Sequence, residues 1–168
     1  ATAKVMRDGW LLTGDLGFLS GNGLYITGRE KDLIIVRGKN FAPEDIERVI
    51  ERLGGVRGGG CIIFAQHDPD TASDHIVAVC ETRIPMRASA SAEADREALK
   101  LLINEATQEA FGLKLLDIAL VPPGTLPKTS SGKKQRSFCA KLYRAGELRP
   151  SRTRAFTAAK LMIAGHLR

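Results

Sequence analysis

The sequence predicts a small domain of the α+β class, a three- to four-stranded sheet with three helices, preceded by a strand-rich fragment. Two observations predict this class: apolar residues repeat at helical spacing in three segments, and short apolar runs bounded by turn-forming residues lie between them. The composition agrees, because 168 residues with 43% hydrophobic and 26% charged residues are enough for one domain with its own core.

Residues 1–30 predict the strands of a meander. Apolar runs at residues 10–12, 16–19 and 24–26 are separated by turn signals, and Asn22-Gly23 favours a hairpin turn. The stretch contains no helical period and is too small to bury its own apolar side chains. We therefore expect it to be the edge of a larger structure.

A strand over residues 32–37 and a loop over residues 38–42 lead into the first helix. Proline is favoured at the first helical position, so we expect Pro43 to begin the helix, and the acidic residues after it suit the positive helix end. Apolar residues then recur at i, i+3, i+4 and i+7 and predict one buried face: Ile46, Val49, Ile50 and Leu53.

Strands over residues 61–66 and 75–81 follow, and a long helix is predicted over residues 92–111, with Gly112 suited to its C-terminus. Its inward side is predicted to consist of Leu99, Leu102, Ile103, Ala106 and Ala110. A strand over residues 117–122 precedes the last helix, predicted over residues 135–146. That helix is expected to turn four residues inward: Phe138, Cys139, Leu142 and Tyr143.

The segment "GTLPKTSSGKKQR", residues 124–136, has no hydrophobic period and cannot be core. It is either a solvated linker or a loop that brings a lysine to an anion. We expect Ser130 and Ser131 to give the loop flexibility and hydrogen bonds, because no His/Asp arrangement supports a nucleophilic role. Lys134 is expected to be a solvated lysine.

The net charge of +6 is distributed unevenly. Residues 1–126 contain 14 Lys and Arg against 18 Asp and Glu, whereas residues 127–168 contain 11 against the single Glu147. A basic end suggests an anionic partner such as a nucleotide, an acidic protein or nucleic acid. Residues 149–168 are predicted to be a basic tail that is either frayed or used for docking.

Metal and disulfide chemistry is not expected. The three cysteines, Cys61, Cys80 and Cys139, are widely spaced and predict buried thiols, and the three histidines show no metal-ligand spacing. No apolar run approaches the roughly 18 residues that a membrane span needs, and the chain begins without a signal-peptide pattern. We therefore expect a cytoplasmic protein without a membrane span.

Three stretches resemble, in order, the motifs of the adenylate-forming superfamily of acyl-CoA synthetases, peptide-synthetase adenylation domains and luciferase. They are "LLTGDLG", "GREKDLIIVRGKNFAPEDIE" and "LPKTSSGKKQR". The second and third are most like the fatty acyl-AMP ligase branch, although Asn40-Phe41-Ala42 stands where that branch usually has Asn-His-Tyr.

The resemblance implies that residues 1–30 are the C-terminal edge of a large N-terminal domain and residues 31–148 a mobile C-terminal domain. In the family, the large domain contains the phosphate-binding loop and the acyl pocket, and nothing in this chain resembles that loop. The implied partners are the chain's own N-terminal domain, ATP with Mg²⁺, a fatty acid and an acyl carrier protein, or coenzyme A instead of the carrier. The Mg²⁺ ligands are not expected in this chain, and the isolated chain is expected to be inactive.

The resemblance also implies roles for individual residues. Lys133 matches the catalytic lysine, whose ammonium stabilises the charge that develops when a carboxylate attacks the α-phosphate. Asp15 matches the acceptor of both ribose hydroxyls, and Arg29 matches an arginine that also reaches the nucleotide. Lys31 matches the hinge, for which Asp32 is the alternative pivot, because polar residues can change φ and ψ there without exposing apolar surface.

The family's second half-reaction uses a rotated domain, in which the loop of Gly38, Lys39 and Asn40 faces the active site. The sequence does not decide whether the acyl group passes to a carrier protein or to coenzyme A, since the features that separate these two reactions lie in the large domain. A basic nucleic-acid-binding module is the third alternative. It is disfavoured because aromatic residues make up only 5% of the chain and do not alternate with the basic ones.

Overall fold

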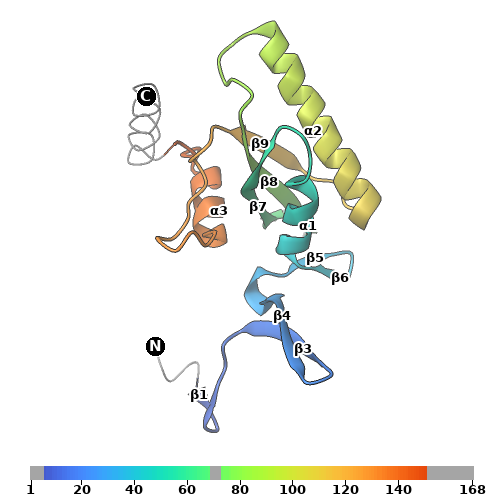
Figure 1. The fold of residues 1–168 in the computed structure, drawn as a ribbon, viewed down its shortest axis with the longest axis vertical. Coiled ribbons are helices and arrows are strands. Elements are labelled where there is room, and N and C mark those ends of the chain that lie inside the picture. Colours follow the sequence, from blue (N-terminus) through green and yellow to red (C-terminus); the bar gives the residue numbers. More distant parts are fainter. Residues whose placement is uncertain (1–5, 69–72, 151–168) are drawn as a thin grey trace, which may run out of the picture.

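The computed structural model describes residues 6–68 and 73–150 (Figure 1). Its centre is a three-stranded sheet in the order β7-β8-β9, with β7 (Val56–Asp68) antiparallel to β8 (Ser73–Thr82) and β9 (Asp117–Val121) parallel to β8. Helices α1 (Pro43–Ile50) and α2 (Ala90–Phe111) cover one face, and α3 (Arg136–Arg144) covers the other. The predicted α+β class is confirmed.

Strand residues alternate between two cores, one on each face of the sheet, as the period of a strand requires. The core under α1 and α2 takes strand residues such as Cys61, Ile63 and Ala78, which pack with Ile46, Ile50, Leu99 and Ile103 of the helices. The core under α3 takes the intervening positions: Ile62, Phe64, Val77 and Val79 with Cys139 and Ala140. Both faces of the sheet are therefore covered.

The long helix α2 has the termini that its sequence favours. The Ser89 hydroxyl accepts a hydrogen bond from the Ala92 N–H at 3.3 Å, and Gly112 ends the helix at φ +68°. The predicted inward face is wrong in part, because Leu102 is 41% exposed and Ala110 is also exposed. Thr107 is buried instead, since its hydroxyl donates to the Ile103 carbonyl at 3.1 Å and so satisfies its own polar group.

Helix α3 packs through small residues. Cys139 and Ala140 are buried against the sheet, and Leu142 and Tyr143 are half-buried. Phe138, predicted to point inward, is 49% exposed, so that prediction is wrong. The two small side chains bring this face of the helix onto the sheet, and Phe138 precedes them on the outer side.

The segment before α1 is a hairpin rather than a strand and a loop. Strands β5 (Ile34–Val36) and β6 (Lys39–Phe41) pair antiparallel, and Arg37 and Gly38 form the turn at φ +49° and +74°. Positive φ at both turn residues is the geometry that matches the twist of a two-residue hairpin. The predicted loop over residues 38–42 is corrected accordingly, because Lys39 and Asn40 lie in a strand.

The N-terminal residues form two separate hairpins, so the predicted meander is wrong. Strand β1 (Met6–Arg7) pairs with β2 (Trp10–Leu11), and β3 (Asp15–Ser20) pairs with β4 (Gly23–Arg29). The second turn is Gly21-Asn22, one residue earlier than expected, because Gly21 takes the positive φ of +57°. The sequence signal missed in the first hairpin is Asp8-Gly9, a dipeptide typical of such turns.

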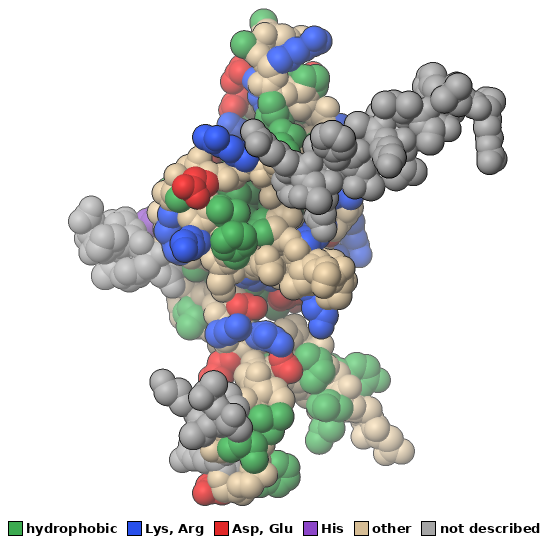
Figure 2. Space-filling model, turned by 90° about the vertical axis from the view of Figure 1, so that its left-hand side faces the viewer, with side chains coloured by type: hydrophobic (Ala, Val, Ile, Leu, Met, Phe, Trp, Pro, Cys, Tyr) green, Lys and Arg blue, Asp and Glu red, His purple; other side chains and the backbone are tan. Residues whose placement is uncertain are grey.

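Large apolar side chains of these hairpins are exposed to solvent (Figure 2). Trp10 is 76% exposed, Leu19 79% and Leu24 67%, and the rings of Phe18 and Tyr25 stack on the β3–β4 hairpin at 5.3 Å. Such an apolar concentration is unusual for a surface that faces only water.

All three cysteines are free and buried, as the sequence predicted. Cys61 and Cys80 lie opposite each other on β7 and β8, with 3.5 Å between their sulfur atoms. Over the ranges that the structure describes, no helix is long and apolar enough to cross a membrane.

Candidate active site

The loop of residues 124–136 is a folded hairpin and not a linker. Lys128 and Lys134 form an antiparallel bridge, and within it the Thr129 N–H donates to the Lys133 carbonyl at 2.9 Å. The Gly132 N–H donates to the Thr129 carbonyl at 2.9 Å, and Gly132 takes a φ of +84°. This turn needs a glycine, because other residues rarely adopt that backbone conformation.

Hydroxyl groups build the tip of the loop. The Thr129 hydroxyl oxygen accepts a hydrogen bond from the Lys133 N–H at 3.0 Å and lies 2.9 Å from the Ser131 hydroxyl. These short local bonds are those that threonine and serine supply in turns. The hydroxyls next to Lys133 therefore have a structural explanation, as expected for Ser131.

A buried carboxylate holds the first end of the loop. Glu81, fully buried on β8, accepts hydrogen bonds from the Gly124 N–H at 2.8 Å and the Leu126 N–H at 3.0 Å. Its other oxygen accepts from the Arg57 guanidinium at 2.6 Å. A buried carboxylate needs such partners, and here they determine where the loop leaves the sheet.

A bulge in β7 provides a further attachment. The pairing register shifts between Val56 and Cys61, and the Gly59 carbonyl accepts a hydrogen bond from the Lys128 ammonium at 2.7 Å. A side chain on Gly60 would meet the Arg57 carbonyl oxygen at 2.7 Å, so the bulge requires a glycine there.

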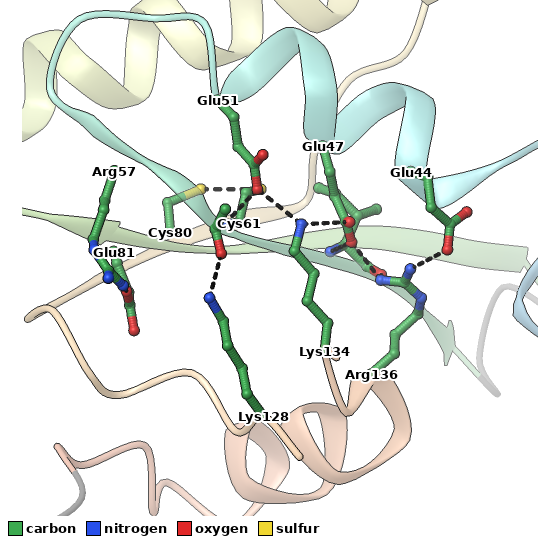
Figure 3. Close-up of polar contacts among 12 residues, drawn as sticks. Glu44, Glu47, Glu51, Arg57, Cys61, Cys80, Glu81, Lys128, Lys134 and Arg136 are labelled. Carbon is green, nitrogen blue, oxygen red and sulfur yellow. Dashed lines mark hydrogen bonds and ion pairs between the residues drawn. The ribbon is translucent and has the colours of Figure 1, made fainter. Parts of the chain in front are cut away.

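Acidic residues of α1 and of its C-cap hold the second end of the loop (Figure 3). The Lys134 ammonium lies 2.8 Å from a carboxylate oxygen of Glu47 and 2.8 Å from one of Glu51. The Arg136 guanidinium pairs with Glu47 and, at 2.7 Å, with Glu44. The expectation that Lys134 is solvated is wrong, because only 23% of its side chain is exposed and its charge is used in the fold.

The cations of this cluster are stabilised in their charged forms. Burial alone would lower the pKa of Lys134, but the charge of Glu47 and hydrogen bonds to Glu47 and Glu51 outweigh it and raise that pKa. Burial likewise opposes the charge of Arg136, and the carboxylates of Glu47 and Glu44 raise the pKa above its ordinary value. Part of the basic excess of residues 127–168 is therefore neutralised by acids of α1.

Lys133 differs from the other cations of the loop. Lys128, Lys134 and Arg136 are bonded to the scaffold, whereas Lys133 is exposed and its ammonium has no ion-pair partner among residues 6–68 and 73–150. The loop thus presents one ammonium on a backbone that is attached at both ends. Such an arrangement suits a group that must meet an anion supplied from outside the domain.

Asp15 and Arg29 lie together on the β3–β4 hairpin. They are directly opposite in the pairing register, and the Arg29 Nε donates to the Asp15 carboxylate at 3.0 Å. The Thr13 hydroxyl oxygen accepts from the Asp15 N–H at 3.1 Å and steadies the start of β3. The two residues predicted to meet the nucleotide are thus neighbours.

Lys31 and Asp32 lie in a short 3₁₀ helix (Glu30–Asp32) between β4 and β5. The Glu30 N–H donates to the Gly14 carbonyl at 2.9 Å, and the Leu33 N–H donates to the Glu30 carbonyl at 3.3 Å. Lys31 is exposed, and the side chain of neither residue is buried in a core. The predicted loop residues Gly38, Lys39 and Asn40 are all exposed on the β5–β6 hairpin.

The structure brings some of the predicted residues together and not others. Asp15 meets Arg29, but no hydrogen bond or ion pair joins either to Lys133 within the part of the chain that is described. Sequence reasoning missed the residues that hold the loop: Glu44, Glu47, Glu51, Glu81 and Arg136. The one available signal was the i, i+4 spacing of Glu47 on α1 and Glu51 at its C-cap, which places two carboxylates on one side of the helix end.

The described residues do not fit a resident metal ion. No group of three or more His, Cys, Asp or Glu side chains among them could hold one.

The fold places this chain among the adenylate-forming enzymes. One similar solved structure comes from work on the fatty acyl-adenylate ligases of E. coli and L. pneumophila. The match covers 86% of this chain and 24% of that chain, at 36% identity and a TM-score of 0.66. The structure of McyG A-PCP complexed with phenylalanyl-adenylate is also similar. Its match covers 98% of this chain and 27% of that chain, at 29% identity and a TM-score of 0.72.

A family model described as "Disco-interacting protein 2-like, AMP domain" matches residues 31–153, and the chain belongs to that family. The chain is 41% identical over 148 residues to the probable long-chain-fatty-acid–AMP ligase FadD30 of Mycobacterium tuberculosis. This match covers 88% of this chain and 24% of that relative. It is 41% identical over 137 residues to the putative fatty-acid–CoA ligase fadD21 of Mycobacterium leprae, covering 80% and 22%. The predicted resemblance is confirmed, and the chain spans about a quarter of the length of these relatives.

Proposed function

We propose that this chain is the lysine-bearing terminal part of an ATP-dependent fatty acyl-AMP ligase. The observation that supports this most directly is the loop of residues 124–136, where Lys133 has no ion-pair partner among the described residues, in a hairpin whose other cations are bonded to the scaffold. Relatives that are named fatty-acid–AMP ligases support the same reaction and a long acyl chain as substrate.

In the proposed reaction, a fatty acid carboxylate oxygen forms a bond to the α-phosphorus of ATP, and the bond from that phosphorus to the bridging oxygen of pyrophosphate breaks. Both reactants are anions, and negative charge moves toward the leaving pyrophosphate. The Lys133 ammonium is placed to offset this charge, and it needs no proton transfer to do so. Anchoring at both ends of the loop lowers the cost of orienting it.

Asp15 and Arg29 are proposed to bind the nucleotide. A carboxylate accepts hydrogen bonds from both hydroxyls of a ribose diol, and the ion pair at 3.0 Å orients Asp15 on its strand. Since 33% of the Asp15 side chain is exposed, its second oxygen is open to a ligand. Arg29, at 55% exposed, is free to contact phosphate or ribose oxygens while it keeps Asp15 in place.

Lys31 or Asp32 is proposed as the pivot between two orientations of residues 31–148. One orientation brings Lys133 to the nucleotide, and the other brings Gly38, Lys39 and Asn40. The exposed 3₁₀ turn between β4 and β5 supports this, because it can change its dihedral angles without uncovering a core.

The acyl acceptor is proposed to be the thiol of an acyl carrier protein. The solved McyG A-PCP structure, which includes a carrier domain, supports this, and the acidic surfaces typical of carrier proteins suit the basic excess of residues 127–168. In the predicted basic tail, Arg149 is exposed, whereas Arg152 and Arg154 lie outside the described residues.

Coenzyme A is the second candidate acceptor, because other relatives of similar identity are named fatty-acid–CoA ligases. Both candidates can be tested with one preparation of the complete ligase, supplied with ATP and a long-chain fatty acid. We expect fatty-acid-dependent ATP–pyrophosphate exchange, followed by acyl transfer to a phosphopantetheinyl carrier and not to coenzyme A. Acyl-CoA as the only product would favour the second candidate, and no exchange with any carboxylic acid would exclude both.

A further inference from the structure

We infer that Lys134 is the positioning residue for Lys133, because it occupies the carboxylates of Glu47 and Glu51 and thereby keeps the neighbouring ammonium free and turned to solvent. The consequence for catalysis rests on the proposed function, whereas the effect on the direction of the Lys133 side chain can be tested without it.

Side chains after the tip of the loop alternate between two environments. Lys133 and Gln135 are exposed, whereas Lys134 and Arg136 are partly buried. The antiparallel bridge between Lys128 and Lys134 makes the backbone extended at Lys134, so the side chains of Lys133 and Lys134 point to opposite sides, and α3 begins at Arg136. The contact of Lys134 with α1 therefore also determines the direction in which Lys133 points.

The two carboxylates that hold Lys134 are themselves attached to the sheet. Glu47 accepts a hydrogen bond from the Ile63 N–H at 2.9 Å, and Glu51 accepts one from the Cys61 N–H at 3.1 Å (Figure 3). The ammonium is thus bound by carboxylates from α1 and from its C-cap residue, and both carboxylates also accept hydrogen bonds from β7. The Lys134 side chain therefore cannot move without breaking ion pairs to two carboxylates that are fixed against the sheet.

The charges of the cluster explain why the ammonium of Lys134 is needed. Three carboxylates, those of Glu44, Glu47 and Glu51, meet the two cations Lys134 and Arg136. Without the charge of Lys134, the carboxylates of Glu47 and Glu51 would lose a partner in a largely buried setting, which is costly.

Two other ammonium groups belong to the loop. Lys128 is already bonded to the Gly59 carbonyl at 2.7 Å, whereas Lys133 has no ion pair with any residue that the structure describes. Lys133 is the cation that the unpaired carboxylate would then attract, and it would leave its exposed position.

The first test measures competitive reductive methylation of each lysine in the 168-residue chain by mass spectrometry. In Lys134→Met we expect the Lys133 amine to react about three- to tenfold more slowly, because it becomes ion-paired and less accessible. In the double variant Lys134→Met/Glu51→Gln the rate should return to within about twofold of wild type, since residue 51 is then neutral and Glu47 keeps Arg136 as its partner. Lys141→Met, an exposed position on α3, is the matched control and should leave the rate unchanged.

An unchanged rate for Lys133 in a folded Lys134→Met variant would overturn the inference, as would slower labelling of Lys128 in place of Lys133. Lys134→Arg provides a test that does not depend on the stability of the methionine variant. It keeps a cation between Glu47 and Glu51, so Lys133 should label at the wild-type rate, and slower labelling there also counts against the inference.

The second test uses adenylation by the complete ligase. Lys134→Met should lower kcat by roughly ten- to hundredfold, with the KM for ATP within about twofold, because the ammonium is misplaced while the nucleotide contacts remain. The Glu51→Gln change should restore most of the loss. If Lys134 only stabilised the fold, kcat would instead fall in proportion to the thermal midpoint of each variant. That correlation would refute positioning.

The two tests separate this inference from the proposed function. If labelling of Lys133 responds as expected but Lys133→Ala leaves adenylation intact, the proposed function fails and the positioning of Lys133 by Lys134 still holds. If Lys133→Ala abolishes adenylation but labelling does not respond to Lys134, the inference fails alone.

Discussion

The ammonium of Lys134 lies 2.8 Å from the carboxylate of Glu47, although the two residues are 87 positions apart in the chain. Glu47 is 2% exposed and also accepts from the Ile63 N–H, so this ion pair joins the loop to both α1 and the sheet. The stability of the domain should therefore depend on the charge of Lys134.

This ion pair predicts a loss of stability at alkaline pH. The folded-state pKa of Lys134 is raised above its ordinary value of 10.5, so its contribution is complete below about pH 10 and is lost as pH rises through the folded pKa. Urea midpoints measured from pH 8 to 11.5 should fall for wild type more steeply than for Lys134→Met. Parallel pH profiles for the two proteins would contradict this prediction.

Lys133→Ala should separate the two half-reactions of the complete ligase. We expect adenylation to fall by several orders of magnitude, because the transition-state charge loses its ammonium, while acyl transfer from preformed acyl-adenylate stays nearly intact. ATP–pyrophosphate exchange and single-turnover transfer measure the two steps, with Lys141→Ala as control. Equal losses in both steps would indicate a structural role for Lys133.

The isolated chain should fold but should not form acyl-adenylate. Its two cores lie within residues 34–148, and the described residues lack the phosphate-binding loop and acyl pocket that the family resemblance assigns to the large domain. A cooperative thermal transition without fatty-acid-dependent ATP–pyrophosphate exchange is the expected result. Exchange above background would show that this chain holds the whole active site.

Lys31→Pro should slow the half-reaction that requires the rotated orientation, because proline fixes φ near −65° and removes a backbone donor. Adenylation and acyl transfer are measured separately, as for Lys133. Asp32→Pro is the matched variant at the alternative pivot. Rates that do not change in Lys31→Pro but fall in Asp32→Pro would move the pivot to Asp32.

Glu81→Ala should destabilise the domain by about 2–4 kcal/mol, because it leaves the Gly124 and Leu126 N–H groups without their acceptor in a buried setting. Glu97→Ala is the control, because Glu97 is 56% exposed and its one ion pair within the described ranges is with Lys100, and it should cost less than about 0.5 kcal/mol. Urea denaturation monitored by circular dichroism measures both. Similar losses for the two variants would argue against the anchoring role of Glu81.

Local pattern was sufficient for much of the fold. The i, i+3, i+4 repeat of Ile46, Val49 and Ile50 located α1, Pro43 located its first residue, and Gly112 located the end of α2. These features depend on residues within one or two turns of each other, and the physical preferences that produce them act at that range. The order of the three motifs likewise identified the superfamily without any coordinates.

Tertiary structure decided which cation of the loop is exposed and which cations are bound to the scaffold. Lys133 and Lys134 are the same amino acid at adjacent positions, and no periodicity distinguishes the one that is exposed from the one that is bound. The distinction arises because Glu47 and Glu51 meet the loop across the edge of the sheet, and buried carboxylates must find cations wherever the fold brings them. Ion pairs between segments 87 residues apart depend on the folded arrangement, and local sequence patterns contain no record of them.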